Sequence, residues 1–249
     1  MLQTLREELL APRYLGWLLD GWLTTLWSSA LVIVAATLLG VLLAAARSGP
    51  SPALRRAGAL YVGALRNTPL LVQLFFWYFG APALLPEALR DWLYAGHVLL
   101  QWPGGPVLLR WPSFEVLCAL VGLTLYAAAY VGEDIRSGIR GVPAPQTQAA
   151  QALGFTHAQS LHHVVLPQAL RIALPPLFGQ YMNIVKNTSL AMAVGLVELS
   201  YASRQVEAET FRTFQSFGIA TLLYVLTIAL LEGLAAVASR RWPAAPARS

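Results

Sequence analysis

The chain has 249 residues, of which 57% are hydrophobic and 12% are charged, and its formal net charge is +5. A mean hydropathy of +0.56 excludes a soluble globular domain, whose surface carries roughly 25–35% charged residues, and indicates an integral membrane protein. The single cysteine, Cys118, excludes an intrachain disulfide and a cysteine-based metal site.

The first element in chain order is the N-terminal segment 1–20, which mixes charged and apolar residues. It has no small-residue cleavage site, so we expect a retained amphipathic segment and not a signal peptide. Residues 21–240 are predicted to form a single transmembrane domain, because no stretch with the composition of a flexible linker interrupts them. Residues 241–249 then form a tail.

Five apolar regions are long enough to cross the ~30 Å hydrocarbon core, which takes ~20 helical residues. They are residues 21–46, 55–82, 114–136, 167–192 and 213–238. Pro69 is expected to kink or break the second, and a loop rich in Pro, Gly and Trp precedes the third. After the polar fourth region, the apolar stretch MAVGLVELSYAS is too short for another crossing and fits a half-inserted turn. We therefore predict an all-α integral membrane protein with five transmembrane helices.

The distribution of arginine predicts the orientation. With five crossings, the connections after the first and third helices share a side with the C-terminus. That side holds more arginines, and they lie in short segments beside helix ends. The positive-inside rule then places the N-terminus outside, and the connection after the third helix and the C-terminal tail in the cytoplasm.

The sequence lacks the residues that several classes of protein require. The arginines are dispersed at helix ends and form no stripe with interleaved aromatic residues, so no nucleic-acid partner is expected. The only lysine is Lys186 and no GxxxxGK loop occurs, so this chain has no ATP site of that type. An ion-coupled secondary transporter remains an alternative, although the crossings carry few acids for a coupling ion. A membrane-embedded enzyme is disfavoured, because no nucleophile-and-base or metal constellation occurs.

The connection between the third and fourth predicted helices has the pattern of a short helix–turn–helix, the elbow, residues 148–167 (QAAQALGFTHAQSLHHVVLP). Its first turn places Gln148 and small alanines on one surface, where another protein can approach the backbone closely. Gly154 ends this helix or lets it turn, and Thr156 is placed to cap the next one. The elbow is therefore predicted to project into the cytoplasm between two spanning helices.

The spacing in the elbow resembles that of the cytoplasmic loop in the permease subunits of ABC importers. The residues in register are Gln148, Ala149, Ala150, Gly154, Val164, Leu166 and Pro167. The segments LRNTPLLVQLFFWYFG, AAYVGEDIRSGI, VVLPQALRIALPPL and VKNTSLA resemble, in the same order, the permeases for polar amino acids, over about residues 20–240. Two residues depart from the pattern: Gln148 replaces the usual Glu, and Asn187 stands where many members have Asp.

This resemblance implies the permease subunit of an ABC importer that moves a polar amino acid across a bacterial inner membrane. The implied partners, besides membrane lipid, are a cytoplasmic ATPase dimer that binds the ATP, a second permease subunit, identical or sister, and an extracytoplasmic amino-acid-binding protein. The elbow would sit in a cleft of the ATPase and transmit rigid-body motion to the third and fourth helices. No cofactor and no covalent chemistry are expected in this chain.

Two segments are predicted to line the substrate path. A break in a helix leaves backbone groups without hydrogen bonds inside the helix, and these groups can solvate a zwitterion. The two segments contain Asn67, Thr68, Pro69, Asn183, Lys186, Asn187, Thr188 and Ser189. A cationic substrate needs a carboxylate partner in such a path, whereas this chain has Asn187 beside Lys186. The sequence around Asn187 also resembles the glutamate/aspartate branch of the family. Glutamate or aspartate is the expected substrate, with glutamine as the alternative.

Two further clusters have ordinary interpretations. His157, His162 and His163 have no carboxylate or cysteine at ligand spacing, so we expect solvated or interface histidines and no metal site. Glu133 and Asp134 close the third predicted helix, and two arginines follow within the next seven residues of the sequence, Arg136 and Arg140. Local ion pairing at the membrane surface is expected there, and the resemblance adds bracing of the elbow as an alternative.

Overall fold

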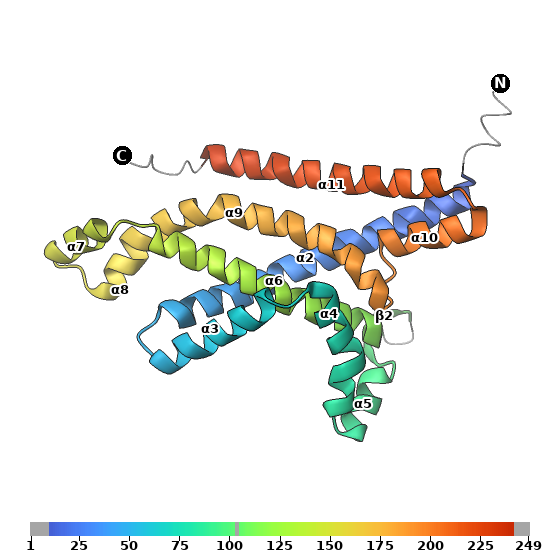
Figure 1. Ribbon diagram of the computed structural model, residues 1–249, viewed down its shortest axis with the longest axis horizontal. Coiled ribbons are helices and arrows are strands. Elements are labelled where there is room, and N and C mark those ends of the chain that lie inside the picture. Colours follow the sequence, from blue (N-terminus) through green and yellow to red (C-terminus); the bar gives the residue numbers. More distant parts are fainter. Residues whose placement is uncertain (1–9, 103–104, 242–249) are drawn as a thin grey trace. The chain divides into compact units, whose positions relative to one another are not determined.

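The structure, a computed structural model, describes residues 10–102 and 105–241 (Figure 1). Residues 1–9 of the predicted N-terminal segment and residues 242–249 of the tail lie outside the described residues. The chain folds into two compact units. The first unit runs to Ser28 and continues with Thr68–Thr124 and Asn187–Ala220, and the second contains Ser29–Asn67, Leu125–Lys186 and the chain from Thr221 onward.

The elements follow one another along the chain as helices with one small hairpin. They are α2 (Pro12–Ser48), α3 (Pro52–Arg66), α4 (Leu70–Phe75), η1 (Phe76–Gly80), η2 (Ala81–Leu84), α5 (Glu87–Tyr94), β1 (Val98–Gln101), β2 (Val107–Arg110), α6 (Phe114–Arg140), α7 (Ala144–Ala152), α8 (His157–Ser160), η3 (Leu161–Val165), α9 (Leu166–Asn187), η4 (Thr188–Val194), α10 (Leu199–Thr210) and α11 (Thr213–Arg241). The segments η1 and η3 are π-helical, and η2 and η4 are 3₁₀-helical.

Three helices of the described chain have the length and hydropathy to cross a membrane, namely α2, α6 and α11. They cover the first, third and fifth predicted regions. Helix α2 begins at Pro12, earlier than predicted, so residues 12–20 continue the first helix and form no separate segment. Helix α6 likewise runs on to Arg140. The predicted boundaries fell inside these helices because apolar composition marks the membrane core and not the helix ends.

The second and fourth predicted regions each contain a change of helix. In the second, α3 ends at Arg66 and α4 begins at Leu70, as expected for Pro69, which lacks an N–H and restricts the residue before it. In the fourth, α9 remains helical through its internal prolines and gives way to η4 at Thr188. Gly195, at φ 92°, then ends η4, so the stretch MAVGLVELSYAS contains the end of η4, a turn at residues 195–198 and the first residues of α10.

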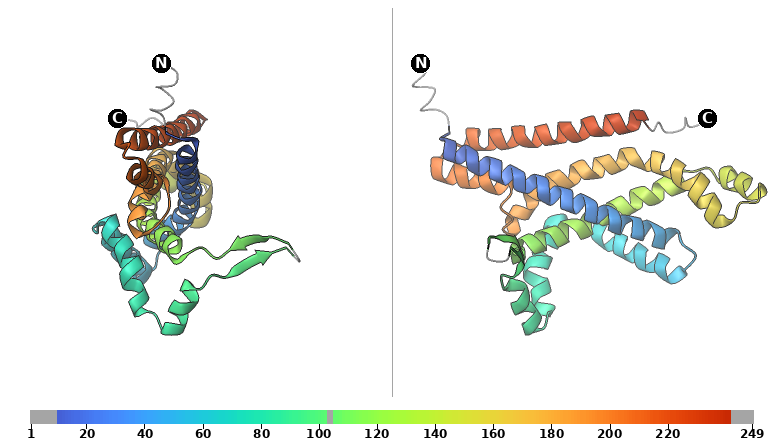
Figure 2. Two further views of the ribbon diagram at one scale, coloured as in Figure 1. Left: turned by 90° about the vertical axis from the view of Figure 1, so that its right-hand side faces the viewer. Right: turned by 180° about the vertical axis from the view of Figure 1, so that it is seen from behind.

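One element corrects the all-α prediction. Strands β1 and β2 pair antiparallel in the loop rich in Pro, Gly and Trp that precedes the third predicted region (Figure 2). Val98 pairs with Arg110 and Gln101 with Val107, with irregular register between them. Each strand has four residues, too few for periodicity in the sequence to mark it.

The second unit is built on α6, which packs closely against α2 and α9. A Cβ atom at Gly132 would meet the Gly40 carbonyl oxygen at 3.0 Å, so these two glycines let α2 and α6 cross at backbone distance. A Cβ atom at Gly138 would meet the Ala169 carbonyl oxygen at 2.6 Å on α9. Val131 of α6 and Leu177 of α9 belong to one buried apolar cluster. Helices α6 and α9 therefore form a close pair.

The first unit is centred on the start of α10. The buried Glu198 side chain accepts a hydrogen bond from the Tyr201 N–H (2.9 Å) and caps α10. The Thr25 hydroxyl of α2 lies 3.4 Å from the Glu198 carboxylate and accepts the Leu199 N–H at 3.2 Å. Gly21 leaves the space for this approach, since its Cβ would meet Ala202 at 2.7 Å. Polar contacts thus fasten α10 to the first turns of α2.

Candidate functional site

The elbow consists of the second half of α7, a glycine turn, α8, η3 and the start of α9 (Figure 1). Helix α7 closes at Leu153, whose N–H donates to the Ala149 carbonyl oxygen. Gly154 follows at φ 88°, a conformation that a residue with a side chain adopts only at a cost. The glycine is thus required by the backbone, and a Cβ atom there would meet nothing within 4 Å. The turn therefore presents an open surface.

Thr156 starts the second half of the elbow, as predicted. Its hydroxyl accepts the Gln159 N–H at 3.2 Å, and the Gln159 side chain accepts the Thr156 N–H at 2.8 Å. This reciprocal capping box satisfies two backbone donors that have no partner inside a helix. From His157 the chain stays helical through α8, η3 and α9 up to Asn187. The fourth predicted region starts at residue 167, and α9 starts one residue earlier, at Leu166, although helical structure already precedes it.

The predicted coupling residues divide into a surface set and a packed set. Gln148, Ala149 and Gly154 are exposed, together with the Leu166-Pro167 pair. Ala150, in contrast, is buried, so it packs inside the elbow and does not contribute to the surface. A conspicuous member of the surface was missed: Leu153, directly before the glycine turn, is 82% exposed. The signal for it in the sequence was a leucine directly beside Gly154, the residue expected to end the helix.

The elbow is joined to α6 and α9 by a small apolar core. Val142, between α6 and α7, packs with Val165 of η3 and Ala169 of α9, and Ile139 of α6 lies against them. α7 also packs against α8 and η3. Both ends of the elbow are therefore held by the α6–α9 pair of the second unit, which is the geometry needed to carry a rigid-body displacement from the elbow into two helices.

An ion-pair cluster lies on α6, centred on Glu133, about two helical turns before the end of the helix at Arg140. The Glu133 carboxylate pairs with Arg136 on the same helix and with Arg47 at the end of α2. These side chains are only 17–20% exposed. The local pairing expected from sequence is confirmed for Glu133, and the structure adds Arg47 as its partner from another helix. Asp134 instead interacts with Gln180 of α9.

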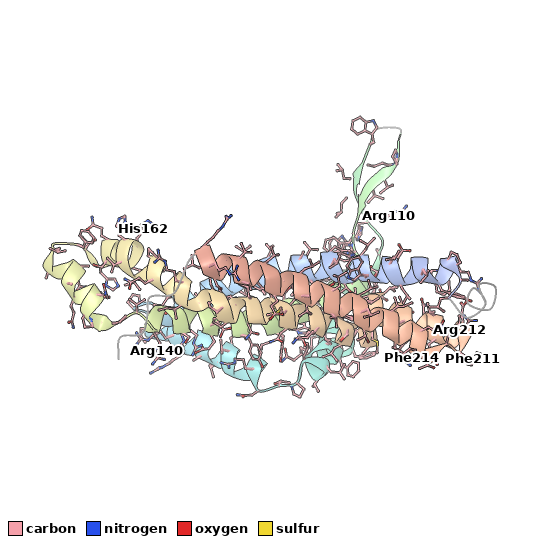
Figure 3. All side chains as sticks on the ribbon, turned by 90° about the horizontal axis from the view of Figure 1, so that it is seen from above. Arg110, Arg140, His162, Phe211, Arg212 and Phe214 are labelled. Carbon is pink, nitrogen blue, oxygen red and sulfur yellow. The ribbon has the colours of Figure 1, made fainter. Side chains whose placement is uncertain are left out.

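The elbow histidines contact aromatic rings. The His163 ring lies edge-on to Phe155, with the centroids 6.3 Å apart, and at 4.8 Å from the ring of His162, which Figure 3 shows on the elbow. Within residues 10–102 and 105–241, no three His, Cys, Asp or Glu side chains form a group that could hold a metal ion. The absence of a metal site stays a prediction.

The predicted substrate-path residues lie at the two helix changes. Asn67, at the C-terminal end of α3, and Pro69, before α4, are exposed, and Thr68 lies between them. On α9, Asn183, Lys186 and Asn187 are spaced by three and four residues and therefore share a helix face. Thr188 is fully buried in η4, and Ser189 follows it.

The elements that follow the two helix changes are in contact. In the first unit α4 packs against η4, and η4 packs against α10. Leu74 of α4 and Ala191 of η4 are fully buried. The structure thus brings together α4 and η4. Asn67, Asn183 and Lys186 belong to the second unit, and the other five predicted path residues belong to the first.

Comparison with known proteins gives one family. Residues 36–242 match the family described as binding-protein-dependent transport system inner membrane component. The chain is 35% identical over 218 residues to the glutamate/aspartate import permease protein GltJ of Escherichia coli (strain K12), covering 88% of this chain and 84% of the relative. It is also 35% identical over 218 residues to the probable glutamine ABC transporter permease protein GlnM of Bacillus subtilis (strain 168), covering 87% of this chain and 89% of the relative.

A solved structure shows the same fold. The crystal structure of an amino acid ABC transporter with histidines superposes with a TM-score of 0.74 at 24% sequence identity. The match covers 92% of this chain and 95% of that chain. The elements described above therefore share the fold of that structure.

Proposed function

We propose a function on the premise that this chain belongs to the family of binding-protein-dependent transport system inner membrane components. It is a multi-pass membrane permease of an ABC importer for amino acids, and its role is transport and not catalysis. The finer proposal is that it imports glutamate or aspartate, driven by ATP hydrolysis in a separate subunit. The observation that carries the mechanism is the elbow: a capped, exposed turn held at both ends by the close α6–α9 pair.

The elbow is proposed to couple this permease to a cytoplasmic ATPase. Its exposed residues Gln148, Ala149, Leu153 and Gly154 form the docking surface, and the apolar core at Val142 and Val165 transmits the displacement. An ATPase dimer then binds the ATP, and two permease subunits, identical or sister chains, face it. An extracytoplasmic binding protein delivers the amino acid.

Copurification tests this assembly. The permease, coexpressed with the ATPase and binding protein encoded beside it, is expected to purify as a complex whose ATP hydrolysis rises when the loaded binding protein is added. An ion-coupled secondary transporter, the alternative, would instead take up amino acid in proteoliposomes without ATP and would respond to an ion gradient. ATP-independent uptake would refute the proposal.

The orientation gives a topology prediction. Cys118 is the only cysteine, and it is buried, so Cys118→Ser provides a background for single labelling sites. In this background Gly96→Cys is expected to react with an impermeant maleimide in intact cells, and Gln151→Cys only after permeabilisation. Both positions are exposed, and a Cβ atom at Gly96 meets nothing within 4 Å. Labelling of Gln151→Cys in intact cells would reverse the proposed orientation.

An acidic substrate is proposed from the residues at the end of α9. Lys186 and Asn187 place a cation and a neutral amide on the face that also carries Asn183, and no acidic residue occurs between residues 135 and 197. An anionic side chain is compatible with this set, whereas a cationic one would lack a carboxylate there. The equal identity to a glutamate/aspartate permease and to a probable glutamine permease keeps glutamine as the alternative.

Asn187→Asp tests the path. The added carboxylate repels an anionic substrate, so uptake of glutamate by the reconstituted complex is expected to fall roughly tenfold, equivalent to ~1.4 kcal/mol. Asn187→Ser, which removes the amide without adding charge, is the control and should retain most uptake. Initial rates are compared for glutamate, aspartate, glutamine and arginine. Preferential arginine uptake by the unmodified complex would refute the acidic substrate, and an unchanged glutamate rate in Asn187→Asp would remove this residue from the path.

A further inference from the structure

Strands β1 and β2 form the hairpin, and β1 exposes apolar side chains on both of its faces. Successive side chains of a strand point to opposite faces. Val98, Leu99 and Leu100 are consecutive, and 53%, 50% and 54% of their surfaces are exposed. Trp102, which follows β1, is 64% exposed. A two-stranded ribbon is marginally stable in water even when one face is polar, so these residues require an apolar environment on both sides.

The base of the hairpin is fixed to α5 by three rings. The His97 ring stacks on Trp92 at 4.7 Å, and the Trp111 ring lies 5.1 Å from Trp92. The backbone N–H of Trp111 donates to the His97 carbonyl oxygen at 2.7 Å and closes the ribbon. Helix α5 and the hairpin therefore form one body within the first unit.

The position of this body follows from α6. Arg110 ends β2, and the apolar helix α6 begins shortly after it, at Phe114. The base of the hairpin is thus level with the N-terminal end of a membrane-spanning helix. Figure 2 shows the ribbon directed sideways from the start of α6, across the helix and not along it, and Figure 3 shows Arg110 at its base. The ribbon therefore runs along the membrane surface.

The amino-acid composition of the hairpin favours lipid as its binding partner. Residues 97–111 contain no acidic residue and one arginine, and Trp92, Trp102 and Trp111 are the residue type that prefers the membrane–water interface. Helix α5 also exposes Leu89 and Trp92 among charged residues, as interfacial helices do. A protein partner would cover one face of the ribbon, whereas the exposed apolar side chains of β1 lie on both faces. The unpaired edges of the strands exclude the hydrocarbon core, where no water satisfies them.

We propose that α5 and the hairpin form an interfacial anchor, which lies among the lipid headgroups and upper acyl chains beside the first turn of α6. Four residues per strand span ~13 Å, more than the ~5–8 Å thickness of the interfacial region on each side of the core, so the ribbon fits this region when it lies along the membrane surface. The anchor fixes the height of the α6 N-terminal end relative to the bilayer.

Fluorescence quenching tests this anchor. Leu99→Cys and Leu100→Cys, each in the Cys118→Ser background, are labelled with bimane in the permease complex reconstituted into nanodiscs. Lipids that carry a nitroxide at an upper acyl position are expected to quench both labels strongly, and aqueous iodide weakly. Gln151→Cys on the exposed elbow is the aqueous control, and Leu222→Cys, on the exposed apolar side of α11, is the lipid control.

Two outcomes would overturn the anchor. Strong quenching by iodide and none by lipid nitroxide at both positions would place the hairpin in water. Protection from both quenchers, together with crosslinking of either cysteine to another chain, would show a protein interface. Leu99→Asp in the Leu100→Cys protein should raise iodide quenching several-fold, whereas Leu99→Phe should leave it unchanged. The side of the membrane rests on the proposed orientation, which the Gly96→Cys labelling tests separately.

Discussion

Gly154→Asp is expected to reduce transport at least tenfold while leaving insertion into the membrane intact. At φ 88° any side chain adds backbone strain, roughly 1–2 kcal/mol, and the new carboxylate enters the exposed surface that we propose docks on the ATPase. The change lies outside every helix long and apolar enough to cross the membrane. The measurements are the amount of permease in the membrane, copurification of the ATPase, and ATP hydrolysis with and without substrate-loaded binding protein.

Two control variants separate the causes. Gly154→Ala adds the strain without the charge and should cost less transport than Gly154→Asp. Gly154→Asn adds a side chain of the same size as Asp without its charge, and asparagine tolerates a positive φ better than most residues, so this variant should lose less transport than Gly154→Asp. Normal transport and normal stimulation of ATP hydrolysis by the Gly154→Asp complex would refute the coupling role of the elbow.

Glu133→Gln is expected to destabilise the permease by roughly 2–3 kcal/mol. The change leaves Arg47 and Arg136 without their shared carboxylate, and both arginine side chains are only 17% exposed. Removing one partner from a largely buried ion cluster lowers the free energy of unfolding by more than the ion pair itself contributes, because the remaining charges stay desolvated. A lower unfolding temperature in detergent, followed by fluorescence-detected size exclusion, is the measurement.

Glu232→Gln is the matched control for this change. Glu232 is an exposed carboxylate on α11, and no ion pair involves it within the described chain, so its replacement should shift the unfolding temperature by less than a degree. Glu133→Asp keeps the charge and should recover part of the loss. If Glu133→Gln and Glu232→Gln melt alike, the cluster contributes nothing to stability.

The elbow could be predicted from sequence because its determinants are local. Thr156 and Gln159, three residues apart, have the spacing of a capping box, and Gly154 is the residue type that most often follows a helix end, so both signals lie within a few residues of the sequence. The break at Pro69 was predictable for the same reason. Composition likewise identified the three apolar helices, since each exceeds the length needed to cross the bilayer.

Features that depend on distant partners could not be predicted. The pairing of Glu133 with Arg47 joins residues 86 positions apart, and the arginine at the end of α2 looked like an ordinary flanking charge. The hairpin was missed because its strands are short and their apolar residues do not alternate with polar ones. The burial of Ala150 was also unpredictable, because the sequence of α7 does not indicate which side of that helix α8 and η3 will cover.

The π-helical turn η3 has a consequence for the register of the elbow. A π turn holds one residue more than an α-helical turn, and each residue of an α-helix rotates by about 100° about the axis. The extra residue in Leu161–Val165 therefore rotates the elbow about the axis of α9, relative to its position in a regular α-helix. A deletion of one residue within this turn would restore a regular α-helix and swing Gly154 by about a quarter of a revolution around α9. The direction in which the permease presents its elbow is thus set by a single inserted residue.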